Sequence, residues 1–311
     1  MNPTAWPLKG RLIAALISGL ALSAAFPPAD QRWVALIALV PFLLALRGAS
    51  ARAGALLGLV AGAAFFGVLL YWISYFGYAA FIALVAAQTA FLVVFGVLAA
   101  RTSRTVAGRI AGAPLLWSGL EVARARYPLG GFSWGVIGYT QHSGGSMLPL
   151  ARVGGVVLLG LAIVLVNALI AEALTSSIAR TAVLVLAIGA VVLVPSLLPL
   201  GIAGRAAGTL DVAAVQGNVP RDRFTGIGRR ELAVPGDSTI VDNHVRETQL
   251  LFDQPKPDLI VWPENSFDRD PRTDPAVFDP VVATIQRIGA PLLAGAILDA
   301  GSRWTNTNLL I

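Results

Sequence analysis

Seven long apolar runs occupy the first two thirds of the chain and restrict it to folds that sit in a lipid bilayer. They lie near residues 11–27, 31–46, 53–76, 78–100, 106–126, 151–173 and 181–200. Each approaches the roughly 20 apolar residues that a helix needs to cross about 30 Å of hydrocarbon. The composition agrees, since 56% of the 311 residues are hydrophobic and 13% are charged. We therefore expect a polytopic α-helical membrane domain of about seven spans over residues 1–207.

The positive charge of the chain indicates membrane topology. The net charge of +6 comes almost wholly from arginine, because Lys9 and Lys256 are the only lysines, and many arginines sit at the ends of apolar runs. This placement favours contact with lipid headgroups over nucleic-acid binding. The chain has no cysteine, and His142 and His244 are its only histidines. A zinc site or a disulfide framework has too few ligands, so we expect no metal and no cofactor.

The same basic residues leave two topologies open. If all seven runs cross from a cytoplasmic amino terminus, the region after residue 200 lies outside. Eight basic residues then face the cytoplasm, namely Lys9, Arg11, Arg47, Arg52, Arg101, Arg104, Arg109 and Arg180. Five face outward, namely Arg32, Arg124, Arg126, Arg152 and Arg205. The fifth run is the weakest, because eleven uncharged residues separate Arg109 from Glu121. If the fifth run does not cross, eleven basic residues face the cytoplasm and two, Arg32 and Arg180, face outward. The region after residue 200 is then cytoplasmic.

Strand-like and helix-like segments alternate after Gly208. Short apolar runs at 210–215, 259–262 and 291–297 are separated by helical patterns near 241–251 and 280–288, with a proline-containing loop at 268–275. This order predicts an α/β sheet with a buried centre. Residues 308–311 begin another strand-like run, and a sheet ending there has an unpaired edge. We interpret residues 208–311 as the N-terminal part of an incomplete domain and the sequence as a fragment.

Two stretches rich in glycine and aromatic residues, 65–78 and 127–141, lie within the membrane region. One interpretation is an aromatic belt at the level of the lipid headgroups. The other is a pair of bent loops that frame a lipid entrance, with Gln141 and His142 supplying hydrogen bonds. Glu121 and Arg124 are three residues apart on a helix face and are expected to pair at the membrane edge. Asn167, deep in the sixth run, is expected to bond between helices.

Glu264 is the best catalytic candidate in the polar region. It follows the apolar run Leu259–Trp262 and begins the sequence Glu264-Asn265-Ser266 after Pro263. Taken alone, these residues also fit a turn in which Asn265 or Ser266 caps a following helix. The residues alone therefore leave both a structural and a catalytic role open for Glu264.

The order and spacing of short motifs resemble the apolipoprotein N-acyltransferases, bacterial membrane enzymes with a nitrilase-like (carbon–nitrogen hydrolase) domain. Each motif is weak alone, but the series is specific. It consists of Phe65-Phe66-Gly67 with Tyr71-Trp72-Ile73, Glu121 with Arg124, Gly131-Phe132-Ser133-Trp134, Gly138-Tyr139-Thr140-Gln141, Val166-Asn167-Ala168-Leu169, Val215-Gln216-Gly217-Asn218-Val219-Pro220 and Val261-Trp262-Pro263-Glu264-Asn265-Ser266.

The resemblance implies a reaction and its partners. A fatty acyl chain passes from a membrane phospholipid, through a cysteine thioester, to the N-terminal amine of the diacylglyceryl-cysteine of an apolipoprotein. In the family's Glu-Lys-Cys triad, Glu264 matches the general base. The lysine, which stabilises the oxyanion, and the cysteine are expected beyond Ile311, so the 311 residues alone are expected to be inactive.

The resemblance also implies a fold and a location. The second domain is expected to adopt the α-β-β-α sandwich of the nitrilases on the outer face of the cytoplasmic (inner) membrane, which favours the seven-span topology. Substrate contacts are expected at Trp134, Tyr139, Gln141 and Trp262.

Two other functions stay open. A membrane-tethered nitrilase-like amidase acting on a small amide shares Glu264, but it has no need of the loops near Phe132 and Trp134. A non-catalytic transporter or scaffold is favoured only if the rest of the protein lacks the cysteine.

Overall fold

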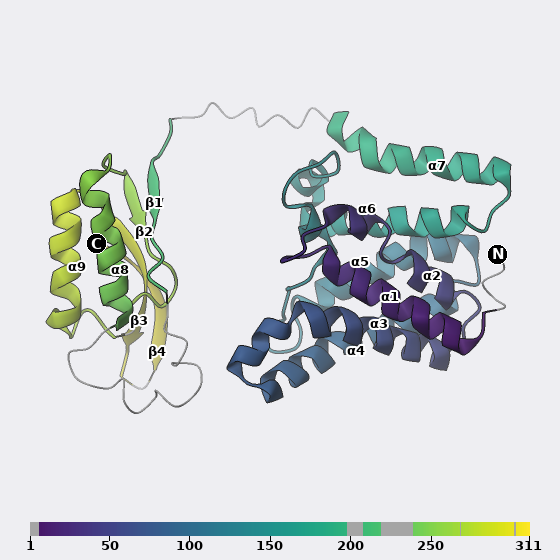
Figure 1. The fold of residues 1–311 in the computed structure, drawn as a ribbon, viewed down its shortest axis with the longest axis horizontal. Coiled ribbons are helices and arrows are strands. Elements are labelled where there is room, and N and C mark those ends of the chain that lie inside the picture. Colours follow the sequence, from purple (N-terminus) through teal and green to yellow (C-terminus); the bar gives the residue numbers. More distant parts are fainter. Residues whose placement is uncertain (1–5, 198–207, 219–238, 268, 302) are drawn as a thin grey trace. The chain divides into compact units, whose positions relative to one another are not determined.

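The chain divides into two compact units, Met1–Ile202 and Ala203–Ile311, drawn in Figure 1. A computed structural model describes residues 6–197, 208–218, 239–267, 269–301 and 303–311. The domain boundary expected between residues 207 and 208 falls at the end of a segment, 198–207, that lies outside the described residues. The end of the seventh apolar run at residue 200 lies in the same segment.

Helices make up the described part of the first unit. They are α1 (Leu8–Ala24), α2 (Val40–Leu46), α3 (Ala51–Leu69), α4 (Tyr78–Thr102), α5 (Ala113–Arg124), α6 (Leu150–Ala173) and α7 (Ile178–Leu193). Short 3₁₀ segments cover Arg32–Leu36, Tyr71–Phe76, Ile137–Gln141 and Val194–Leu197, and a π-helical segment covers Gly108–Gly112.

Four helices of the described residues are long and apolar enough to cross a bilayer: Ala51–Leu69, Tyr78–Thr102, Leu150–Ala173 and Ile178–Leu197. The other three expected runs form shorter helices. The first gives the 17 residues of α1, the second is divided between a 3₁₀ segment and the seven residues of α2, and the fifth gives the 12 residues of α5. The helical membrane class is confirmed, and the seven-span count stays a prediction.

The third expected run, 53–76, is shorter as a helix than its sequence indicates. Helix α3 ends at Leu69, and the aromatic residues after it form the 3₁₀ segment. Gly77 then adopts a φ of +118°, a conformation that a residue with a Cβ rarely takes. The chain therefore turns at Gly77 into α4.

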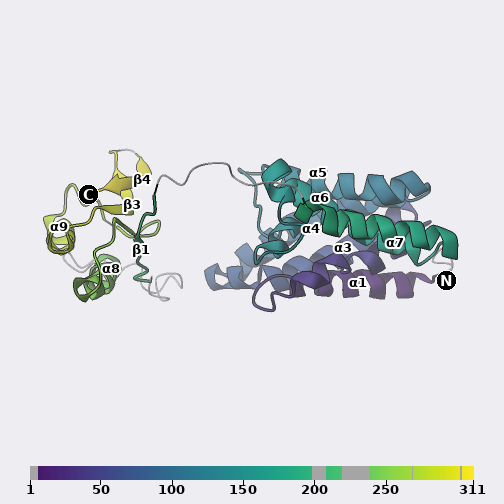
Figure 2. The ribbon, with the colours of Figure 1, turned by 90° about the horizontal axis from the view of Figure 1, so that it is seen from above.

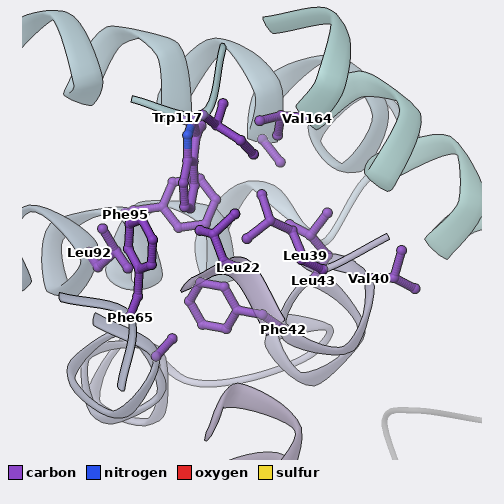
Figure 3. Close-up of a cluster of buried hydrophobic side chains, with 14 of the residues drawn as sticks. Leu22, Leu39, Val40, Phe42, Leu43, Phe65, Leu92, Phe95, Trp117 and Val164 are labelled. Atoms are coloured by element: carbon purple, nitrogen blue, oxygen red, sulfur yellow. The ribbon is translucent and has the colours of Figure 1, made fainter. Parts of the chain in front are cut away.

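Aromatic rings fill the centre of the helical unit (Figure 3). The Phe95 ring lies 5.1 Å from the Trp117 ring, edge to face, and 5.8 Å from the Phe42 ring. Around this centre, glycines bring the helix backbones close together. A Cβ added to Gly58 of α3 would lie 2.2 Å from the carbonyl oxygen of Leu92 in α4. Such close approach gives helices van der Waals contact in lipid, where burial of apolar surface drives association weakly.

The second unit contains a four-stranded sheet in the order β1-β2-β3-β4. The strands are β1 (Val212–Ala214), β2 (Leu259–Val261), β3 (Leu292–Asp299) and β4 (Trp304–Leu310). The first three are parallel and β4 is antiparallel to β3. The helices α8 (Thr239–Gln249) and α9 (Pro275–Ile288) cover one face (Figures 1 and 2). This is a small mixed sheet with one helical layer in the described residues, and the α-β-β-α sandwich stays a prediction.

Helix α9 begins five residues before the start expected at Pro280. Pro275 lies in its first turn, where a missing backbone N–H costs nothing. Val277, Val281 and Ile285 follow at helical spacing and are buried against the sheet. The apolar face thus extends across Pro280, which marks an interior position of the helix.

We expect Gly58→Ala to destabilise the helical unit. The added Cβ would collide with the backbone of α4, and overpacking of this kind costs about 1–3 kcal/mol. Thermal unfolding of the purified protein in detergent, followed by circular dichroism, measures the effect. Gly67→Ala on the same helix is the control, because no atom of the described residues lies within 4 Å of its added Cβ. Equal midpoints for the two variants would contradict the close approach of α3 and α4.

Candidate functional site

Glu264 lies in a tight turn just past the carboxyl end of β2. This strand is held on both sides, since the Val215 N–H donates to the Val261 carbonyl and the Trp262 N–H donates to the Leu293 carbonyl, each at 2.9 Å. After Pro263 the chain reverses at Asn265, whose φ is +57°. Asparagine tolerates this left-handed conformation better than most residues.

Ser266 and Gly295 attach the Glu264 turn to β3. The buried Ser266 hydroxyl donates to the Gly295 carbonyl at 2.9 Å, and the Phe267 N–H donates to the same oxygen at 3.2 Å. A Cβ on Gly295 would lie 2.7 Å from both the Glu264 Cα and the Pro263 carbonyl oxygen. Only glycine therefore lets the turn pack this closely on β3. The structural interpretation in which Ser266 caps a following helix is wrong, because the Ser266 hydroxyl bonds to β3 and the next helix of the described residues, α9, begins only at Pro275.

The Glu264 side chain is exposed, and its Oε1 accepts a hydrogen bond from the Asn306 amide on β4. An amide donor fixes the direction of the carboxylate. The arrangement therefore gives an oriented carboxylate at the edge of the sheet that is able to accept a proton from a group placed above it.

A buried network supports the turn from beneath. Trp262 is 3% exposed, and its indole N–H donates to the Thr248 hydroxyl at 2.9 Å. That hydroxyl donates in turn to the His244 carbonyl at 2.6 Å, and the His244 and Trp262 rings lie 5.1 Å apart. These contacts tie the end of β2 to α8. The structure gives Trp262 core contacts, and its contact with a substrate stays a prediction.

His244 joins the turns that follow β1 and β2, a role that the sequence analysis missed. Its Nδ1 lies 2.8 Å from the Ile240 carbonyl, while its Nε2 has no partner among the described residues. Burial lowers the pKa of His244, so the ring is neutral and Nδ1 carries the proton. A Cβ on Gly217 would lie 2.6 Å from the His244 backbone nitrogen. The sequence does contain one indication of this role: His244 and Thr248 are four residues apart and therefore lie on the same face of an amphipathic helix.

The helical unit contains an apolar groove beside its aromatic loop. The groove has a volume of about 580 Å³, and its lining includes Phe26, Leu69, Trp72, Trp134, Tyr139 and His142. Two of the four residues expected to contact substrate are exposed here: Trp134 is 52% exposed and Tyr139 is 47% exposed. The Trp72 and Trp134 rings lie 5.1 Å apart. The groove has the apolar lining that a lipid chain requires.

The expected pair of Glu121 and Arg124 is present and holds the aromatic loop. Arg124 Nη2 lies 3.8 Å from Glu121 Oε1. Arg124 Nη1 donates to the carbonyls of Trp134 at 2.8 Å and Phe132 at 3.1 Å, and Glu121 Oε1 accepts from the Ile137 N–H at 2.8 Å. The pair is buried in the protein, because the loop backbone needs these partners. Its position at the membrane edge stays a prediction.

The remaining polar residues singled out in the sequence connect segments of the helical unit. Gln141 is buried, and its amide donates to the Arg32 carbonyl at 3.2 Å. Its contact with a substrate stays a prediction. His142 Nε2 lies 3.0 Å from an Asp30 carboxylate oxygen. Asn167 accepts from the Leu39 N–H at 2.9 Å and donates to the Ala35 carbonyl at 2.8 Å, which confirms it as a partner between helical segments.

Comparisons with known proteins agree with the motifs. Residues 18–169 match the family described as the apolipoprotein N-acyltransferase N-terminal domain. The apolipoprotein N-acyltransferase of Mycolicibacterium smegmatis is 35% identical over 93% of this chain and 52% of its own length. That of Gloeobacter violaceus is 28% identical over 92% of this chain and 56% of its own length. The apolipoprotein N-acyltransferase of Geobacter metallireducens is 31% identical over 54% of this chain and 34% of its own length. The chain spans about half the length of the first of these relatives.

We expect Thr248→Val to destabilise the second unit by about 1–3 kcal/mol, because it leaves the buried Trp262 indole N–H without an acceptor. Denaturant unfolding followed by tryptophan fluorescence measures the change. Thr284→Val on α9 is the matched control, since its buried hydroxyl donates to the Pro280 carbonyl of its own helix, at 2.8 Å. An equal loss of stability in both variants would contradict the role of Thr248 as the support of Trp262.

Proposed function

We propose that this chain, which belongs to the apolipoprotein N-acyltransferase family, supplies the membrane domain and the general base of an enzyme that acylates lipoproteins. The observation that carries the proposal is the Glu264 carboxylate, exposed and oriented by Asn306 at the carboxyl end of a central parallel strand. Catalytic groups commonly lie at such strand ends in α/β folds. The family supplies the chemistry in which a carboxylate at this position takes part.

In the proposed mechanism Glu264 moves one proton at each step. It takes the proton of a cysteine thiol, and the thiolate attacks the ester carbonyl of a phospholipid. The proton then passes to the departing lysophospholipid oxygen as the thioester forms. In the second half, Glu264 accepts a proton from the lipoprotein amine as the amide forms, and the proton returns to the thiolate. The 311 residues contain no cysteine, so the nucleophile and the oxyanion-stabilising lysine are proposed to come from the rest of the protein.

The apolar groove is proposed to receive an acyl chain of a lipid substrate. Trp134 and Tyr139 present exposed ring surface at this groove. Arg124 fixes the loop by its bonds to the Phe132 and Trp134 carbonyls, so the Trp134 ring is held in place before a lipid arrives. We assign Gln141 and Trp262, which are both buried, the task of supporting the two loops. A small-amide hydrolase has no use for such a groove, and this favours the acyltransferase over the amidase.

The proposed location is the cytoplasmic (inner) membrane, with the second domain on its outer face. Helices of membrane-spanning length and the acyltransferase relatives support a membrane protein. The lipoprotein acceptor is presented at the outer face in the family, which favours seven crossings from a cytoplasmic amino terminus.

We expect Glu264→Gln, in the protein that contains this chain, to lower kcat for acylation of a diacylglyceryl lipopeptide by about 10²–10⁴-fold, because an amide cannot accept the proton. Mass spectrometry of the lipopeptide, with phospholipid vesicles as donor, measures the product. Asp279→Asn, at an exposed position of α9, is the control and retains activity. Full activity of the Glu264 variant would remove the carboxylate from the mechanism. Hydrolysis of a small amide without lipopeptide acylation would favour the amidase.

The topology can be tested with single cysteines, because the 311 residues contain none. We expect Asp279→Cys to react with a membrane-impermeant maleimide in intact cells, because seven crossings place its domain outside. Arg101→Cys, at the end of α4, is expected to react only after the cells are permeabilised. The reverse pattern would contradict the seven-span topology and place the second domain in the cytoplasm.

A further inference from the structure

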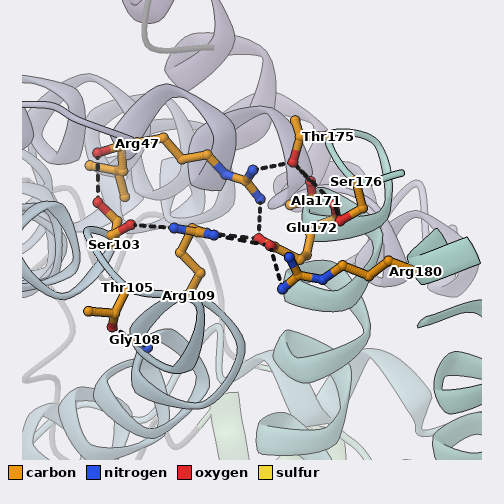
Figure 4. A network of polar contacts seen from close by, with 11 residues as sticks. Arg47, Ser103, Thr105, Gly108, Arg109, Ala171, Glu172, Thr175, Ser176 and Arg180 are labelled. Carbon is orange, nitrogen blue, oxygen red and sulfur yellow. Dashed lines mark hydrogen bonds and ion pairs between the residues drawn. The ribbon is translucent and has the colours of Figure 1, made fainter. Parts of the chain in front are cut away.

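A second charged cluster lies where α6 ends and α7 begins (Figure 4). The buried Glu172 carboxylate accepts hydrogen bonds from Arg109 Nε at 2.7 Å and Arg109 Nη2 at 3.0 Å. Arg47 Nη2 lies 3.0 Å and Arg180 Nη2 lies 3.2 Å from the same carboxylate. One negative charge therefore faces three guanidinium groups, and the cluster keeps an excess of two positive charges.

The backbone brings these arginines together from distant parts of the sequence. Arg47 follows the last residue of α2, Arg180 lies in the first turn of α7, and Arg109 lies in the π-helical segment before α5. The wider π-helical turn is uncommon and occurs often at functional sites. Besides its ion pair with Glu172, Arg47 donates from Nη1 to the Thr175 hydroxyl, which ties the end of α2 to the end of α6.

No other acidic residue of the membrane region is available to balance the cluster. Residues 1–207 contain only Asp30, Glu121 and Glu172 as acids. Asp30 pairs with His142, and Glu121 pairs with Arg124. A partly buried excess of positive charge is unfavourable unless an anion compensates it. The missing anion must therefore come from outside the helical unit.

The geometry places this anion on the side of Arg180. The internal cavity beside Arg47 and Arg109 has a volume of only about 20 Å³, which holds no ligand larger than water. The Arg180 side chain is 45% exposed. Ser177, which precedes α7, makes no side-chain capping bond to the first N–H groups of that helix. Open N–H groups at a helix start attract anions, and Arg180 lies in the same first turn.

We propose that Arg180, at the start of α7, and Arg109, in the π-helical segment before α5, bind the phosphodiester of an anionic phospholipid. Helices α6 and α7 both have the length and apolarity of membrane spans, so their junction lies at the boundary between hydrocarbon and headgroups. The phosphates at that depth belong to lipids. Basic pockets between membrane helices bind anionic headgroups in this way.

This headgroup site is separate from the groove proposed for the acyl chain. Gly138, in the segment next to that groove, packs against Val156 of α6. Glu172 lies sixteen residues farther along the same helix, which corresponds to about 24 Å. The bound lipid is therefore a stabilising lipid at the other end of the helical unit and does not serve as the acyl donor.

The test compares the chain and its Arg180→Gln variant in nanodiscs of phosphatidylcholine alone and of an equimolar mixture with phosphatidylglycerol. Native mass spectrometry counts the retained phosphatidylglycerol, and thermal unfolding reports its stabilising effect. We expect the variant to bind phosphatidylglycerol about fivefold more weakly. Its unfolding midpoint in phosphatidylcholine alone is expected to match that of the unaltered chain, because Arg180 is half exposed. Arg126→Gln is the control, an exposed arginine whose Nη1 donates to the Val122 carbonyl of α5.

Three results would overturn the proposal. The first is unchanged retention of phosphatidylglycerol by the Arg180 variant, and the second is an equal loss in the Arg126 variant. The third is a lower unfolding midpoint of the Arg180 variant in phosphatidylcholine alone that accounts for the whole effect, which would make the arginine purely structural. Glycerol phosphate is added in a separate arm. Displacement of phosphatidylglycerol at equal concentration would identify a site for free phosphate in place of a lipid.

Discussion

Lipid offers no hydrogen bonds, so the backbone N–H and C=O groups of the helical unit that face lipid must find their partners within the protein. This constraint explains where the chain departs from regular helix. Asn167 bonds to the backbone at Ala35 and Leu39, where the second apolar run changes from a 3₁₀ segment to α2. Arg124 and Glu121 bond to the loop that carries Trp134. The irregular segments are possible because helical side chains complete their backbone hydrogen bonds.

The second unit places its candidate base by the same means. The position of Glu264 depends on the Ser266 hydroxyl, on the absence of a side chain at Gly295, and on the indole of Trp262. The Ser266 and Gly295 contacts fix the turn on β3, the Trp262 contact ties the end of β2 to α8, and Asn306 orients the carboxylate. The turn is therefore fixed while the carboxylate stays exposed, as the proposed general base requires.

The sequence was sufficient for features that depend on short spacings. The apolar runs predicted helices, three-residue spacing predicted the pair of Glu121 and Arg124, and an apolar run before a proline placed Glu264 at the end of a strand. Contacts between residues far apart in the sequence could not be predicted from it. Nothing in the sequence brings Arg47, Arg109 and Arg180 to one carboxylate, because their convergence depends on helix packing. The burial of Trp262 likewise depends on α8, whose Thr248 and His244 are distant from it in the sequence.

The two buried carboxylates of the helical unit show how one interaction supports two roles. Glu121 faces one arginine, and both side chains bond to a loop backbone, so the pair is balanced in charge and buried. Glu172 faces three arginines, one of which is half exposed. A balanced buried pair has no charge left to attract a ligand, and it can only hold the chain in place. An unbalanced cluster attracts an anion for the same electrostatic reason that it needs its carboxylate.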